Sequence, residues 1–191
     1  MPKPAQTEAN NIPLGCNAYV DETKARGYVL AVVFVPARDV HKLRATLRSL
    51  RAAGSRSIHF HKANNSQRAA VIDALVTHEV KALIITNRTH PRTPPREASI
   101  RALARQAVQL DVSLIVLERD QTVERKDRRW LFEELNKTTV RYEHRDRHED
   151  ALLWAADAIA WCWQHGEPWK QRTRSLIAQH VDAQSLLPSN P

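Results

Sequence analysis

The sequence predicts a single α/β domain with a largely parallel sheet that begins with one antiparallel pair. Short β-branched runs alternate with segments whose apolar residues recur at helical spacing, which is the pattern of α/β folds. The first two runs, 16–20 and 27–35, are separated by only a few residues and therefore indicate a hairpin. A chain of 191 residues suits one well-buried domain better than two. We expect residues 1–15 to be a flexible leader, 16–181 the domain and 182–191 a tail.

The elements after the hairpin follow from the same patterns. Pro36 suits the first turn of a helix, the apolar residues from Val40 to Leu50 keep helical spacing, and Gly54 is a natural stop. Asn64, Asn65 or Ser66 can cap the next helix. Strands are expected at 57–60, 80–86 and 112–117 and at the sheet edge at 138–142, and helices at about 96–110, 126–136 and 168–181.

The segment from Glu149 to Trp163 is apolar on nearly every face of a helix, so it predicts a helix inside the domain. Its one central carboxylate is Asp157. An unpaired buried carboxylate is costly, and such a group shifts its pKa, finds a partner or binds a metal. Asp157 therefore either hydrogen-bonds a neighbouring backbone or joins other acidic groups. The tryptophans of this helix are expected in the core rather than as stacking platforms for bases.

Composition excludes several classes of protein. No run approaches the roughly 18 apolar residues that span a bilayer, so no membrane association is expected. The amino-terminal residues show no secretory signal, which favours a cytoplasmic protein. Four glycines leave neither a dinucleotide fingerprint nor a phosphate-binding loop. Cys16 and Cys162 have no metal-type spacing, and Cys162 is expected to be a small core residue.

The formal charge of +8 favours polyanions such as nucleic acid as partners. The excess of arginine is spread along the chain rather than held in one tail. The sequence does not define the oligomeric state or distinguish RNA from DNA. Two groups of basic residues are candidates for a positive face: Arg125, Lys126, Arg128 and Arg129, and then Arg141, Arg145 and Arg147.

Three acidic residues occupy positions where they can converge. Asp21 ends the first strand, Glu118 ends a later buried strand, and Asp157 lies in the buried helix. Because the carboxyl ends of parallel strands share one sheet edge, a helix packed across that edge could bring Asp157 to the other two. Three carboxylates repel one another unless a cation is present. Ligation by oxygen alone suits Mg²⁺ or Mn²⁺, and two such ions support attack on a phosphodiester.

Four segments, in this order and spacing, resemble one known family. They are AYVDET at 18–23, RSIHFHK at 56–62, LIVLERD with the following ERKDRR at 114–129, and LLWAADAIAW at 152–161. The chain from about Asn17 to Ile177 resembles the domain-of-unknown-function family numbered three thousand eight hundred, within the ribonuclease H-like superfamily. The apolar helix with its Ala-Asp pair is the most specific segment.

The resemblance implies a ribonuclease H-like, three-layer fold with a metal-dependent nuclease centre. It implies that Asp21 is the first-strand acid, His59 the family's histidine and Asp157 the helical acid. Glu118 and Asp127 fall where related sequences place further acidic residues. The chain departs from the family at Ser57, where many relatives carry an acidic residue. Glu22 or Glu118 could supply the missing ligand.

Each candidate also has a structural interpretation. Asp21 and Glu22 could begin a turn, and Glu118 could pair with an arginine. Asp127 could simply favour the start of a helix through the helix dipole. If His59 and His61 alternate along a strand, only one of them can face the site.

The sequence therefore supports two functional hypotheses. The first is a Mg²⁺- or Mn²⁺-dependent nuclease in which Asp21, Glu118 and Asp157 hold the metal and His59 orients water or relays a proton. The second is a catalytically inactive ribonuclease H-like module that binds nucleic acid or a protein partner. Glu22, His61 and Asp127 are secondary site candidates.

Overall fold

The sheet of this protein has six strands in the order β5-β4-β1-β2-β3-β6. The computed structural model describes residues 11–87 and 93–186. Among the described strands, β2 alone runs against the others, because it is antiparallel to both β1 and β3 while the remaining pairs are parallel. The sheet thus has two antiparallel pairs where the sequence predicts one. The strands are β1 (Cys16–Thr23), β2 (Val29–Pro36), β3 (Lys81–Thr86), β4 (Leu114–Glu118), β5 (Arg141–Arg145) and β6 (Ile177–Asp182).

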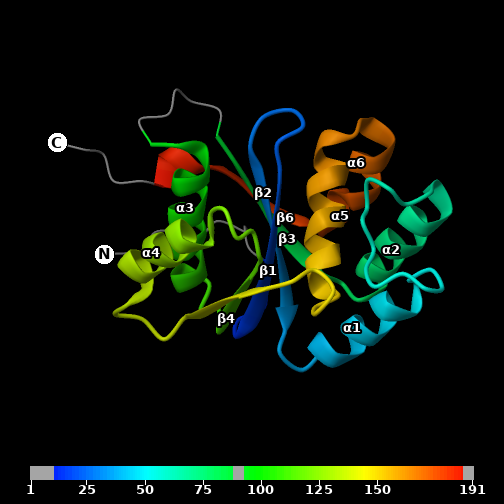
Figure 1. The fold of residues 1–191 in the computed structure, drawn as a ribbon, viewed down its shortest axis with the longest axis horizontal. Helices are drawn as coiled ribbons and strands as arrows, with labels where there is room; N and C mark the ends of the chain where they lie inside the picture. The colour runs from blue at the N-terminus through cyan, green and yellow to red at the C-terminus, as the bar shows by residue number, and fades with distance from the viewer. Residues whose placement is uncertain (1–10, 88–92, 187–191) are drawn as a thin grey trace, which may run out of the picture.

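Helices cover both faces of the sheet and make three layers, which confirms the predicted fold class (Figure 1). α3 and α4 lie on one face, and α1, α2, α5 and α6 lie on the other. The helices are α1 (Val40–Ser49), α2 (Asn65–Thr77), α3 (Pro95–Gln109), α4 (Glu124–Leu135), α5 (Leu152–Gln164) and α6 (Glu167–Thr173), with short 3₁₀ turns η1 (Arg174–Leu176) and η2 (Ala183–Leu186).

Two hydrophobic cores explain the continuous apolar character of β2. Ala31 and Val33 face the core shared with α1, α2 and α5, whereas Val32 and Phe34 face the core shared with α3 and α4. A strand buried on both faces needs apolar residues at every position. In β1 the same alternation puts Tyr19 on the α5 side and Val20 on the α3 side. Asp21 therefore faces the α5 side, and Glu22 faces the α3 side.

The helix α5 is the inner helix that the sequence predicts. It packs along β1 and β2, and its small side chains, among them Ala155, Ala156 and Ala158, are completely buried. Trp154 is buried at 2% exposure. Trp161 is partly buried, with the Arg68 guanidinium 4.2 Å above its ring and the His165 ring stacked at 3.8 Å. The rings of Trp154 and Trp161 are therefore both packed against other parts of the protein.

Two predicted elements are wrong and one is displaced. Residues 57–60 form no strand; the chain turns there, and the amide nitrogens of Lys62 and Ala63 donate to the carbonyl of His59. The argument that His59 and His61 alternate along a strand therefore fails. The expected helix 168–181 ends at Thr173, and β6 follows because its partly apolar residues pair with β3. The edge strand β5 covers 141–145 instead of 138–142.

The packed structure extends beyond 16–181 at both described ends. Ile12 is 7% exposed and joins the core on the α3 side, as does Ala183 of η2. Arg105 of α3 donates to the carbonyl of Leu186 at 2.6 Å. Residues 1–10 of the expected leader and 187–191 of the expected tail lie outside the described residues. Within the ranges described, no helix has the length and apolar character needed to cross a membrane.

Candidate carboxylate site at the sheet edge

Asp21, Glu118 and Asp157 come together at the carboxyl ends of the neighbouring strands β1 and β4, on the face of the sheet that α5 covers. β1 and β4 are parallel neighbours, and Val20 pairs with Leu117, so Asp21 and Glu118 stand side by side in the register. Asp157 reaches the same place from the middle of α5. The convergence expected from the sequence is thus present in the fold.

The side chain of Arg147 lies between these three carboxylates. Its Nη2 is 3.0 Å from Asp21 Oδ2 and 2.5 Å from Glu118 Oε2, and its Nη1 is 2.5 Å from Asp157 Oδ2. Its Nε donates to Glu118 Oε1 at 3.0 Å, which makes the pair with Glu118 bidentate. Charge-assisted bonds of this kind are stronger than neutral hydrogen bonds. One guanidinium therefore serves as the counter-ion of the whole group.

The turn between β5 and α5 holds Arg147 in place. The indole Nε1–H of Trp154 donates to the Arg147 carbonyl at 2.8 Å. Asp150, whose side chain is completely buried, accepts from Arg44 of α1 at 2.7 Å and from Arg145 of β5 at 2.5 Å. These contacts fix the backbone of the turn from which the Arg147 side chain extends.

Backbone amides orient two of the carboxylates. The Phe60 amide donates to Asp157 Oδ2 at 2.9 Å, and the Glu22 amide donates to Asp21 Oδ1 at 2.8 Å. The turn that carries Phe60 is itself held by Arg68, which donates to the carbonyls of Phe60 and His61 at 3.0 and 2.9 Å. The interpretation of Asp157 as a group bonded to backbone is therefore correct, together with its convergence on Asp21 and Glu118.

The electrostatics of the site reflect crowded negative charge. Burial, and then the neighbouring Glu118, raise the pKa of Asp21 well above its ordinary value, although Arg147 opposes the shift. Burial also raises the pKa of Glu118, again against Arg147. Burial lowers the pKa of Arg147, but the carboxylates of Asp157, Asp21 and Glu118 outweigh it and leave that pKa above the usual value.

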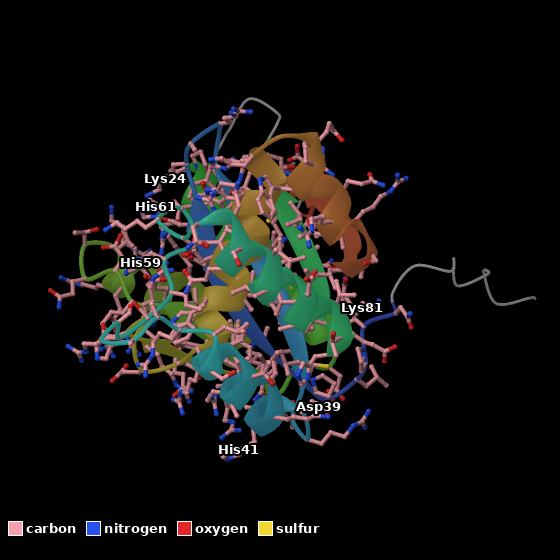
Figure 2. The ribbon with its side chains drawn as sticks, turned by 90° about the vertical axis from the view of Figure 1, so that its right-hand side faces the viewer. Lys24, Asp39, His41, His59, His61 and Lys81 are labelled. Carbon is pink, nitrogen blue, oxygen red and sulfur yellow. The ribbon has the colours of Figure 1, made fainter. Side chains whose placement is uncertain are left out.

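His59 and His61 project from the turn before α2 (Figure 2). Both side chains are exposed, and their rings are 6.2 Å apart. Burial and then the charge of Arg147 lower the pKa of His59, which places this imidazole within the field of the site. Ser57, at the position where the resembled family has an acid, has its Oγ 3.4 Å from His59 Nε2.

Glu22 and Asp127 lie on the opposite face of the sheet and belong to a separate network. Arg96 of α3 pairs with both, and it meets Asp127 Oδ2 at 2.6 Å. Asp127, in the first turn of α4, is completely buried and also lies 3.4 Å from His144 Nε2. The structure therefore does not bring Glu22 or Asp127 to Asp21, Glu118 and Asp157.

Sequence reasoning placed Arg147 only in a candidate positive face and missed its position among the acids. The signal was present, because three carboxylates that converge require a cation and the chain itself is rich in arginine. Ten positions separate Arg147 from Asp157 across an irregular turn, and no periodicity spans that distance.

The donor atoms suit a hard divalent cation, but their present spacing does not. Carboxylate oxygens are the ligands that Mg²⁺ and Mn²⁺ prefer. In residues 11–87 and 93–186, however, no group of three or more histidine, cysteine or acidic side chains is close enough together to hold a metal ion. The carboxylates stand around a guanidinium, which is wider than an ion. Metal binding here would require Arg147 to leave and the three acids to close in.

An open hollow of about 140 Å³ adjoins the site at the carboxyl ends of β1 and β4. Asp21 and Glu118 form part of its wall, and Arg96 and Arg119 form another part. Asp157 and Arg147 do not line this hollow, and its other lining residues, among them Leu30, Arg96 and Ile100, belong to the α3 side of the sheet.

Comparison with known proteins identifies the fold. No family model matches the sequence, and no curated protein matches it either. The structure is similar to the solved structure of the PCNA:RNase HII complex from Archaeoglobus fulgidus, with a TM-score of 0.57 and 16% sequence identity over 83% of this chain and 77% of that chain. The chain therefore has a ribonuclease H-like α/β fold. The resemblance to the family numbered three thousand eight hundred stays a prediction.

Proposed function

We propose that this protein is a nuclease that uses Mg²⁺ or Mn²⁺ to hydrolyse phosphodiester bonds in nucleic acid. The observation that carries the proposal is the convergence of Asp21, Glu118 and Asp157 on one cationic position. Three carboxylates close together in a partly buried position repel one another and destabilise the fold. Acidic groups perturbed in this way are typical of functional sites. The likeness to the solved RNase HII complex supports the proposal through the fold alone.

The proposed roles follow from the positions of the side chains. Asp21, Glu118 and Asp157 would hold the metal through oxygen atoms. A bound divalent ion would supply an activated water and stabilise charge on the phosphate. His59 is exposed beside the site, and the lowered pKa of its imidazole favours the neutral form. A neutral imidazole can orient water or accept a proton.

Exposed cations of α1 and of the loop that carries His59 would contact the nucleic acid backbone. The helix α1 and the loops that follow it carry basic side chains towards solvent, and phosphates bind such groups without regard to sequence. The net charge of +8 agrees with a polyanionic partner. The exposed cations of this region are Lys42, Arg48, Arg51, Arg56 and Lys62.

A second candidate function rests on Arg147. A guanidinium that already neutralises Asp21, Glu118 and Asp157 suits a catalytically inactive module that binds nucleic acid or a protein partner. Binding of nucleic acid by such a module would weaken with salt and need no divalent ion.

A cleavage assay separates the two candidates. Labelled single- and double-stranded RNA and DNA and an RNA–DNA hybrid would be incubated with Mg²⁺, Mn²⁺ or EDTA. We expect metal-dependent cleavage that falls by about 100-fold or more in Asp157→Asn. Asp73→Asn is the matched control, because Asp73 lies on α2 and pairs with Arg172 at the surface.

Cleavage that is equal in EDTA and Mn²⁺, or equal in Asp157→Asn and the wild type, would contradict the proposed site. Salt-dependent binding to these nucleic acids without cleavage of any of them would favour the inactive module.

A further inference from the structure

The carboxylate site contains a cation that belongs to the chain itself. The Nη2 atom of Arg147 contacts Asp21 Oδ2 and Glu118 Oε2, and its Nη1 atom contacts Asp157 Oδ2. These are the oxygen atoms that a divalent ion would need. An ion that bound all three oxygens at about 2.0–2.1 Å would occupy the space between them that the guanidinium now fills.

We propose that Arg147 is an exchangeable counter-ion that couples metal binding to phosphate binding at this site. In the ion-free protein its guanidinium neutralises the carboxylates. When a divalent ion binds, Arg147 leaves them and pairs with a phosphate of the nucleic acid. This inference rests on the proposed function and names the chemistry that regulates the same site.

The surroundings of Arg147 permit the exchange as a movement of the side chain alone. Its backbone is fixed by the Trp154 indole and by the buried Asp150, which Arg44 and Arg145 hold. The side chain itself is 15% exposed, and all its hydrogen bonds come from the guanidinium nitrogens, which also reach the Ile58 carbonyl at 3.5 Å. The exchange requires these bonds to break and the side chain to rotate about its own bonds.

Phosphate is the anion that suits the displaced guanidinium. The planar fork of an arginine matches phosphate oxygens in bidentate fashion. A guanidinium displaced from three carboxylates would recover charge-assisted hydrogen bonds by binding a phosphate beside the same site. Because a phosphate stabilises the displaced position, it must raise the affinity for the ion, and the ion must raise the affinity for phosphate by the same factor.

The test is a titration of Mn²⁺ that does not depend on activity. Binding to the wild type, Arg147→Gln and Arg147→Lys would be followed by the electron paramagnetic resonance signal of free Mn²⁺, alone and with each nucleic acid of the cleavage panel. Arg101→Gln is the matched control, because Arg101 is 19% exposed and also pairs with three carboxylates, those of Glu97, Glu133 and Glu134 on α3 and α4. Circular dichroism would check that each variant is folded.

We expect Arg147→Gln to bind Mn²⁺ at least about tenfold more tightly than the wild type, a change of about 1.4 kcal/mol. Arg147→Lys should lie between them, because one ammonium group cannot bridge three carboxylates. Arg101→Gln should resemble the wild type. Nucleic acid should tighten Mn²⁺ binding to the wild type and not to Arg147→Gln.

The proposal fails if either Arg147 variant binds Mn²⁺ no more tightly than the wild type, or if nucleic acid enhances binding equally with and without Arg147. Should Arg147→Gln not fold, the comparison of Arg147→Lys with the wild type decides. Cleavage and Mn²⁺ binding by the wild type, with no gain in the variants, would overturn this inference and leave the nuclease standing. Absence of Mn²⁺ binding in all four proteins would overturn both.

Discussion

Asp21 shows, at the scale of one residue, the electrostatic cost of the carboxylate site. Its side chain is 9% exposed and stands beside Glu118 on the neighbouring strand. Burial first, and Glu118 second, raise its pKa well above the ordinary value, and Arg147 offsets only part of this. A carboxyl group whose pKa is higher in the folded state than in the unfolded state destabilises the fold once the pH ionises it.

We therefore predict that Asp21→Asn stabilises the ion-free protein at pH 7. Stability in the wild type is fully present below the unfolded pKa of about 4 and falls as the pH rises through the raised folded pKa. Asparagine has no charge to bury, so the melting temperature should rise by about 2–4 °C, the shift that ~1 kcal/mol gives in a domain of this size. Thermal melts with EDTA at several pH values measure it. The gain should vanish below about pH 4, and a loss of stability at pH 7 would contradict the account of Asp21.

The residues of the site differ in how far the sequence could predict them. Asp21, Glu118 and Asp157 could be placed together because strand ends and one apolar helix are local patterns. The separation of Glu22 from Asp21 also follows from strand alternation. Arg147 could not be placed, because an irregular turn positions it and its long side chain has several accessible rotamers. The chemical role of the three acids stays a prediction.

At the scale of elements, the turn between β5 and α5 positions the site. Asp150 ties α1 to β5 through Arg44 and Arg145, and it also accepts from the Leu152 amide at the start of α5 at 3.1 Å. This one carboxylate thus fixes the entry of the inner helix and the turn that carries Arg147.

We predict that Asp150→Ala lowers the free energy of unfolding by about 3 kcal/mol, because it removes a buried carboxylate and leaves the partly buried guanidinium of Arg44 without its partner. Asp146→Ala in the same turn removes an exposed ion pair with Arg119 and should cost less than about 1 kcal/mol. Urea unfolding followed by circular dichroism compares the two. Equal effects of both substitutions would show that the stability of the turn between β5 and α5 does not depend on Asp150.

Elements with strong local signals were predicted correctly, and elements defined by tertiary pairing were not. The apolar run of β2, the Asn64 cap of α2 and the inner helix α5 all follow from local chemistry. The segment 57–60 has β-prone residues but no neighbouring strand to pair with, and it turns instead. The sequence of β6 predicts the end of a helix, but these residues form a strand because they pair with β3.

At the scale of the whole molecule, the sheet topology brings distant segments to one edge. β1 lies between β2 and β4, so Asp21 from the start of the chain meets Glu118 from its middle, and α5 delivers Asp157 from the last third. The alternation of helices and strands predicts this class of fold from sequence. The reversed β2 and the edge position of β6 depend on long-range pairing that no local pattern encodes.

The most direct test of the account is a crystal structure of the protein grown with MnCl₂, with anomalous diffraction data collected at the manganese absorption edge. The account predicts an anomalous peak bounded by the carboxylates of Asp21, Glu118 and Asp157, with the Arg147 guanidinium turned away from them. Crystals that contain Mn²⁺ but show no peak at this position, with Arg147 still paired to the three acids, would contradict it.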